Sequence, residues 1–262
     1  MNYFYFPRLG AVYLSIPKNA CSSVKRSALV YEGDILPTDD PRGDVHGIAR
    51  KYRVSDAEAE ALSRGPHPPQ FFTVLSDPLR RYISSYLDKF CLSYPNPEPY
   101  VASFPLGANI SFVKFLEYVS EARVETLNEH WRHQSSFFCP DIRIDHFFWL
   151  DDMKKLTDLP IGSLSMPLLN VDHHSTTRIE SGTGGQSLSI FSSAQEIHEN
   201  LRITNKLPPR SLFVEQLSEP LEKISFSVAE HLHQEKEFVK TAFEYKEDQA
   251  VVSETDASST CF

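Results

Sequence analysis

Positively charged and hydroxyl side chains stand together where the first apolar strand of the sequence meets its first helix. Segment 11–16, AVYLSI, is rich in β-branched and aromatic residues, which predicts a short buried strand that ends at Pro17. A helix is expected to begin at Cys21, so residues 18–20 form a tight turn between the two elements. The N–H groups of a first helical turn and the positive end of the helix dipole attract anions. The junction therefore predicts a site for a phosphate or a phosphate-like group.

The side chains of this junction suit an anion. Lys18 adds a full charge, and Ser22 and Ser23 add hydroxyl donors. The residues expected around the anion are Pro17, Lys18, Asn19, Ala20, Cys21, Ser22 and Ser23. The nucleoside-triphosphate loop differs, because its lysine follows a glycine-rich arch, and this chain has no glycine between Ala11 and Glu32. The alternative is an ordinary strand, turn and helix with a surface lysine.

A second strand runs directly into a second helix. Segment 70–75, QFFTVL, predicts another buried strand, and Asp77 before Pro78 predicts a helix start with a side-chain cap. Apolar side chains recur along one side of the helix 78–90 at the helical period. The opposite side carries Arg80, Arg81, Ser84, Ser85 and Asp88. Ser84 lies four residues after Arg80 and three after Arg81, so it neighbours both on the helix surface.

Together these segments resemble the carbohydrate sulfotransferase family that contains the chondroitin and dermatan enzymes, sulfotransferase family 2. Residues 16–26 are similar to the family pattern I-P-K-x-x-C-S-x-x-K-R. Residues 75–90 are similar to V-R-D-P-x-x-R-x-x-S-x-Y-x-x-K-F, except that Ser76 stands where the family has an arginine. Residues 128–134, NEHWRHQ, are similar to a third element, N-E-H-W-x-P-Q, and the resemblance extends from residue 11 to about residue 170.

The resemblance implies an activity and a donor. Family members transfer a sulfuryl group from 3′-phosphoadenosine 5′-phosphosulfate (PAPS), without a metal, to a carbohydrate hydroxyl. The first junction would hold the 5′-phosphate, and Ser84 with Arg81 would hold the 3′-phosphate. Ser76 offers one neutral donor in place of an arginine fork. Either Arg80 or Arg81 compensates, or donor affinity is reduced, or the chain keeps the fold without catalysis.

Catalytic roles follow from the same resemblance. Lys18 would stabilise the charge that develops on the bridging oxygen during an in-line displacement. An acceptor hydroxyl needs a general base. Among the ten histidines, His46 is the first candidate because relatives have a V-H element between the two phosphate motifs, and His130 is the second. Trp131 is expected in the core.

The pattern predicts an α/β, P-loop-like three-layer fold with a central, mostly parallel sheet flanked by helices. We expect one domain over residues 1–245 and a disordered tail over 246–262, which is polar and lacks periodicity. Residues 3–6 predict an edge strand that pairs with the strand at 11–16, and 44–63 has helical character.

Composition limits the class of partner. The net charge of −9 argues against binding nucleic acid, which needs a basic surface. The sequence has no apolar run of about 18 residues and no signal-peptide pattern at its start. The four cysteines lack metal-type spacing, which favours a reduced protein. Animal relatives are membrane-anchored Golgi proteins, so these features predict a bacterial-type, cytoplasmic member of the family.

Two functions of different class remain open. The first is a PAPS-dependent sulfotransferase that acts on a carbohydrate or glycoconjugate hydroxyl. The second is a non-catalytic protein of the same fold that binds a nucleotide or a partner, and Ser76 is the residue that favours it. A small-molecule kinase would share the architecture, but the sequence lacks the lysine-terminated loop of that class.

Overall fold

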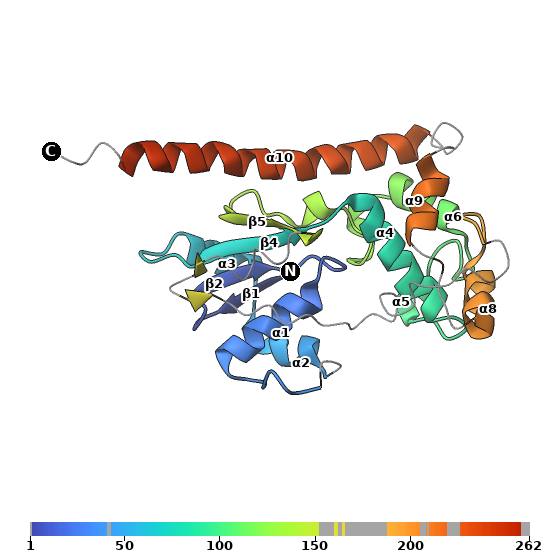
Figure 1. Cartoon of the computed structure of the whole chain (residues 1–262), viewed down its shortest axis with the longest axis horizontal. Helices are drawn as coiled ribbons and strands as arrows, with labels where there is room; N and C mark the ends of the chain where they lie inside the picture. Colours follow the sequence, from blue (N-terminus) through green and yellow to red (C-terminus); the bar gives the residue numbers. More distant parts are fainter. Residues whose placement is uncertain are drawn as a thin grey trace. The chain divides into compact units, whose positions relative to one another are not determined.

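The computed structural model describes residues 2–40, 43–151, 160–161, 164–165, 188–204, 208, 210–218 and 226–257 (Figure 1). The described residues form two compact units. The sheet unit draws on Met1–Ser76, Gln134–Asn170 and Gln234–Phe262, and the helical unit draws on Asp77–His133 and Val171–His233. The single domain that we expected over residues 1–245 stays a prediction.

The sheet unit contains a five-stranded sheet in the order β3-β1-β2-β4-β5. Its strands are β1 (Tyr3–Phe6), β2 (Ala11–Leu14), β3 (Arg53–Val54), β4 (Gln70–Leu75) and β5 (His146–Trp149). Strand β4 pairs in parallel with both β2 and β5, whereas β1 pairs antiparallel with β2 and β3. Strands β2, β3, β4 and β5 therefore run in the same direction and β1 runs against them, because the turn at 7–10 reverses the chain after β1. The sheet is mostly parallel by strand direction, as expected, with one antiparallel strand inside it. A separate pair, β6 (Pro160–Ile161) and β7 (Leu164–Ser165), is antiparallel.

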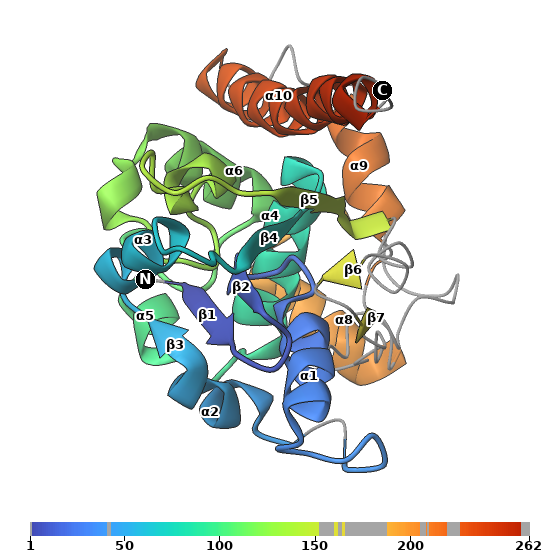
Figure 2. The same cartoon turned by 90° about the vertical axis from the view of Figure 1, so that its left-hand side faces the viewer.

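Alternating side chains of the strands build a core on each face of the sheet. Tyr13 of β2 and Phe72 of β4 stack at 5.1 Å and pack with Leu29 of α1 (Cys21–Glu32) and Val45 of α2 (Val45–Ala49). Their strand neighbours Val12, Leu14, Phe71 and Leu75 point to the other face, where Ala59 of α3 (Asp56–Ser63) and Val239 of α10 (Phe226–Ala257) join them. Figures 1 and 2 both show α1 and α2 side by side. Successive side chains of each strand point to opposite faces of the sheet, and helices cover both faces.

The stretch at 44–63 is not one helical segment. After α2, a 3-10 turn η1 (Arg50–Tyr52) leads into β3, which pairs with β1, so β1 is not an edge strand. A new helix, α3, then begins after Ser55, whose hydroxyl accepts from the Glu58 N–H while the Glu58 carboxylate accepts from the Ser55 N–H. This reciprocal capping box starts a helix wherever it occurs. The apolar periodicity alone had not separated the two helices.

The helical unit is built around α4 (Pro78–Tyr86), with Asp77 capping the Arg80 N–H as the sequence predicted. A π-helical turn η2 (Leu87–Leu92) continues α4, and the other helices are α5 (Pro99–Ala102), α6 (Phe112–Glu121), η3 (Val124–Thr126), α8 (Ala194–Thr204) and α9 (Arg210–Ser218). Aromatic rings form much of its core. Trp131 is 2% exposed, and its ring centroid lies within 6.0 Å of the ring centroids of Phe90, Phe104 and Phe115. Trp131 is a core residue, as expected.

The expected disordered tail over residues 246–262 stays a prediction. Helix α10 continues through this region to Ala257, and residues 258–262 lie outside the described part of the chain. Within the described residues, none of the helices combines the length and the apolar character needed to cross a membrane.

Candidate functional site

The turn between β2 and α1 has an unusual backbone. Lys18 has a φ of 71° and Ala20 a φ of 55°, both in the left-handed region that residues with a side chain rarely adopt. Each such residue costs roughly 1–3 kcal/mol, and strain of this kind concentrates at functional sites. Ala20 occupies the N-cap of α1 and has no side-chain oxygen to accept from the first-turn N–H groups. The turn thus leads into a helix N-terminus of the kind that binds anions.

Asn19 holds this strained turn in place. Its side chain is fully buried, and its Nδ2 donates to the Val74 carbonyl at 2.9 Å and to Gln134 Oε1 at 2.7 Å. Its Oδ1 accepts from Ser76 Oγ at 2.6 Å. The amide therefore joins the turn after β2 to the carboxyl end of β4. This fixed attachment keeps the Lys18 backbone in its left-handed conformation.

Ser76 belongs to this buried network. It is 2% exposed, its N–H donates to Gln134 Oε1 at 3.2 Å, and its carbonyl accepts from Gln134 Nε2 at 3.0 Å. The hydroxyl donates to Asn19, so it supports the turn. The expected place of Ser76 among the donor-binding residues stays a prediction.

Gln134 also connects the site to α10. Its N–H donates to Glu235 Oε2 at 2.8 Å, and the Ser135 hydroxyl donates to Glu235 Oε1 at 2.9 Å. Glu235 is 3% exposed, so its carboxylate is a buried acceptor for two donors of the η4 turn (Gln134–Phe137). Buried charges need such partners. The network that begins at Asn19 therefore ends on the C-terminal helix.

Ser22, in the first turn of α1, contacts His46 of α2. Ser22 Oγ lies 2.9 Å from His46 Nε2, and Lys25 Nζ lies 3.5 Å from His46 Nδ1. Ser22 and Lys25 are buried, at 7% and 6% exposed, while the histidine is exposed. The ammonium of Lys25 also lies 4.0 Å from the centroid of the Phe4 ring, a cation–π contact. Both nitrogens of His46 are thus engaged by residues of α1.

The local sequence fixes where α2 begins. Asp44 caps the helix, and its Oδ1 accepts from the Gly47 N–H at 2.7 Å. A Cβ at position 47 would lie 1.9 Å from Asp44 Oδ2, so only glycine fits against this cap. The cap and the glycine together set the position of His46 on the first turn of α2.

In the helical unit, the basic side chains of α4 have different surroundings. Arg81 is 1% exposed, and its guanidinium donates to the carbonyls of Arg132 at 2.6 Å and Glu129 at 3.1 Å. The Ser85 hydroxyl donates to the His130 carbonyl. Arg80 is exposed and Ser84 is 7% exposed. Arg81 therefore holds the 129–132 backbone, and Arg80 is the arginine of this pair that solvent reaches.

His130 lies on the segment that Arg81 and Ser85 hold. Its N–H donates to Asn128 Oδ1 at 3.0 Å, and its ring Nδ1 lies 2.7 Å from the same oxygen. An oxygen accepts, so Nδ1 carries the proton and Nε2 is the basic nitrogen of the neutral ring. The ring stacks on Tyr100 at 5.4 Å with a 7° interplanar angle.

Two histidines near this segment form a buried pair. His231 of α10 is 6% exposed, its ring lies 4.3 Å from that of His133, and its Nε2 lies 2.8 Å from the Tyr82 hydroxyl. Burial, with a smaller contribution from His133, lowers the pKa of His231 to about 4. His231 is therefore neutral at physiological pH.

The expected site residues divide between the two units. Residues 17–23, His46 and Ser76 gather in the sheet unit, and Arg80, Arg81, Ser84 and His130 belong to the helical unit. Sequence reasoning assigned no role to Lys25, Gln134 or Glu235. Lys25 and Gln134 stand inside the quoted patterns, which was the available signal; Glu235 had none.

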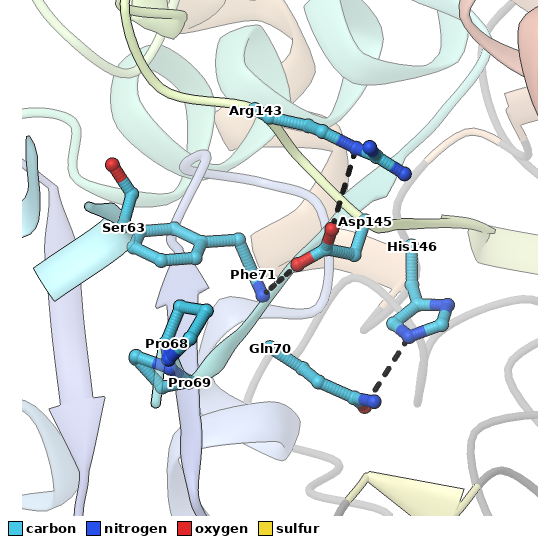
Figure 3. A pocket seen from close by; sticks show the side chains of 8 residues that line it. All are labelled: Ser63, Pro68, Pro69, Gln70, Phe71, Arg143, Asp145 and His146. Atoms are coloured by element: carbon cyan, nitrogen blue, oxygen red, sulfur yellow. Dashed lines mark hydrogen bonds and ion pairs between the residues drawn. The ribbon is translucent and has the colours of Figure 1, made fainter. Parts of the chain in front are cut away.

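A cavity of about 520 Å³ lies at the amino ends of the parallel strands, where β4 and β5 begin (Figure 3). Its charged and polar lining includes Asp145, which accepts from the Phe71 N–H at 2.8 Å, and His146, whose Nε2 lies 3.3 Å from Gln70 Oε1. Arg143 lies 3.5 Å from Asp145. This cavity is separate from the Lys18 turn, which follows the carboxyl end of β2.

Fold and geometry define an α/β protein in which a left-handed turn joins the carboxyl end of the parallel strand β2 to the N-terminus of α1. The model of the Sulfotransferase family matches residues 1–206 of the 262, so the chain belongs to this family, as its motifs predicted. It is similar to mouse carbohydrate sulfotransferase 12, at 27% identity over 54% of this chain and 42% of that protein.

The human protein carbohydrate sulfotransferase 14 is similar at 28% identity, over 46% of this chain and 35% of that protein. The chain thus spans less than half the length of these curated relatives. No solved structure matches it significantly.

Proposed function

We propose that this protein is a PAPS-dependent sulfotransferase that transfers a sulfuryl group to a hydroxyl of a carbohydrate or glycoconjugate. The observation that carries the proposal is the left-handed Lys18 turn, anchored by Asn19, at the N-terminus of α1. Family membership and the names of the related proteins support the reaction class and the acceptor class.

The residues of the junction fit the 5′ end of such a donor. The first-turn N–H groups of α1, the Lys18 ammonium and the hydroxyls of Ser22 and Ser23 are all donors or positive charges, as a phosphosulfate requires. When bound, PAPS supplies the sulfuryl group and leaves as an adenosine bisphosphate. In this proposal Lys18 stabilises the negative charge that builds on the bridging oxygen.

For the 3′-phosphate we propose Arg80 and Ser84. Arg81 already donates to two backbone carbonyls, whereas Arg80 is exposed and lies one helical turn before Ser84. In this proposal Arg80 supplies the positive charge that relatives supply with an arginine at the position of Ser76.

For the general base we propose His130. The tautomer set by Asn128 places the basic lone pair of the neutral ring on Nε2. At His46 the corresponding lone pair is on Nδ1, which faces the Lys25 ammonium. These contacts support His130 as the first candidate for the base and His46 as the second, the reverse of the order that we expected from the sequence.

Titration calorimetry with 3′-phosphoadenosine 5′-phosphate (PAP), followed by transfer of labelled sulfate to a panel of oligosaccharides, tests the proposal. Binding of PAP and labelling of a carbohydrate are the expected results. Binding without labelling of any acceptor favours the alternative, a non-catalytic protein of this fold. If PAP does not bind, the protein is neither a PAPS-dependent sulfotransferase nor a non-catalytic protein that binds this nucleotide. The expected cytoplasmic location and the absence of nucleic-acid partners stay predictions.

A further inference from the structure

We infer that His46 is a positioning residue that acts through Ser22: Lys25 fixes the tautomer of His46, and the ring in turn aims the Ser22 hydroxyl proton at the bound anion. This inference rests on the proposed function for the identity of the anion, the 5′-phosphate of the donor. The relay itself rests on the contacts among the three side chains.

The relay begins at Lys25. Its ammonium has three donors and accepts no hydrogen bond. It lies 3.5 Å from His46 Nδ1 and 4.0 Å from the centroid of the Phe4 ring, and the side chain is 6% exposed. The contact with the Phe4 ring favours the charged form of the Lys25 ammonium. Because the ammonium can only donate, Nδ1 of His46 has to accept.

The second step follows from the chemistry of imidazole. A neutral ring that accepts at Nδ1 carries its proton on Nε2. That nitrogen lies 2.9 Å from Ser22 Oγ, so it donates to the hydroxyl oxygen. The oxygen accepts from His46, and its own proton is left to donate in another direction.

The direction matters because a phosphate only accepts. If the Ser22 hydroxyl donated to His46, its lone pairs would face the anion and repel it. With the inferred tautomer, the hydroxyl can donate toward an anion beside the first-turn N–H groups of α1. Ser22 is 7% exposed, so water competes little for this orientation. His46 therefore sets the polarity of a donor in the anion site.

Nitrogen NMR tests the relay without any ligand. In wild-type protein labelled at histidine, we expect the His46 ring to be the neutral Nε2–H tautomer at pH 7.5. In Lys25→Met, which keeps the apolar stem and removes the donor, this preference should weaken. An Nδ1–H ring in the wild type overturns the relay. Because the wild-type spectrum decides this point, the test stands even if Lys25→Met does not fold.

Binding of PAP tests the effect on the anion. Ser22→Ala should weaken binding about tenfold, because a hydrogen bond to a charged group is lost. His46→Leu should weaken binding by a similar factor, and His46→Gln, whose amide N–H can still donate to Ser22, should recover most of the loss. His67→Leu, a change at an exposed histidine of the same unit, is the matched control. Adenosine 3′-phosphate, which lacks the 5′-phosphate, should bind all variants equally.

A double variant separates this role from a structural one. If His46 acts through Ser22, then Ser22→Ala/His46→Leu should bind PAP no more weakly than Ser22→Ala alone. Additive losses overturn the relay. If wild-type protein fails to bind PAP while its His46 ring is the Nε2–H tautomer, the proposed function and the ligand named here are wrong, but the relay contacts are upheld.

Discussion

Ser76 Oγ donates to Asn19 Oδ1 at 2.6 Å, and this bond joins two segments that are 57 residues apart in the chain. It ties the end of β4 to the turn that carries Lys18. Sequence comparison presents Ser76 as a lost arginine. In the structure the same serine is buried and supports the turn that carries Lys18.

Removing the Ser76 hydroxyl should therefore destabilise the sheet unit. In Ser76→Ala, the buried Asn19 Oδ1 loses this donor, at a cost of roughly 1–3 kcal/mol in the free energy of unfolding. Urea unfolding measures the change. Ser103→Ala, at an exposed serine with a 3.4 Å hydrogen bond, is the control and should change little. Equal effects of the two changes would contradict a supporting role for Ser76.

Lys18→Ala should lower the rate of transfer far more than it weakens PAP binding. The lysine is proposed to act on charge that exists only in the transition state, and removing one such group costs about 10²-fold or more in rate. Single-turnover rates with labelled PAPS, beside calorimetric Kd values for PAP, separate the two effects. Lys114→Ala, at a side chain that is 65% exposed, serves as the control. An unchanged rate removes Lys18 from the mechanism.

Arg80 and Arg81 should behave differently when each is replaced by methionine. Arg81→Met leaves the part-buried carbonyls of Glu129 and Arg132 without their guanidinium donors and removes a side chain that is 1% exposed, so it should lower the stability by roughly 2–5 kcal/mol. Arg80→Met should leave stability nearly unchanged, because this side chain is exposed.

Nucleotide binding by the same pair tests the 3′-phosphate assignment. Arg80→Met should weaken PAP about tenfold and leave adenosine 5′-phosphate, which lacks the 3′-phosphate, unaffected. If Arg80→Met binds PAP as tightly as wild type does, then Arg80 does not hold the 3′-phosphate.

Stability should fall as the pH is lowered from about 6.5 to about 4, in part because of His231. Its pKa is about 4 in the folded protein and 6.5 as a free side chain, so the unfolded chain binds the proton more readily. The stabilisation is complete above pH 6.5 and is lost as the pH falls toward 4, and it amounts to at most about 3 kcal/mol. Urea unfolding at pH 7 and pH 4.5 should show a smaller pH dependence for His231→Phe than for wild type. The same pH dependence in both proteins would exclude this contribution.

Local patterns determined much of the sheet unit and the start of the helical unit. The apolar runs placed β2 and β4, and small and polar residues after Pro17 placed the beginning of α1. The pair Asp77-Pro78 placed the beginning of α4. These signals are local because caps, prolines and hydrophobic periods act within one or two helical turns. They were enough to name the family.

Tertiary structure decided which polar groups meet. Nothing local pairs Ser76 with Asn19, directs Arg81 to carbonyls 48 and 51 residues away, or attaches Gln134 to Glu235. The edge of the sheet likewise depends on tertiary pairing, because β3 is a strand of two residues that forms beside β1. Whether His46 donates or accepts at each nitrogen depends on Lys25, which lies on another helix. Hydrogen-bond direction is a property of the partner, so the residue type alone does not contain it.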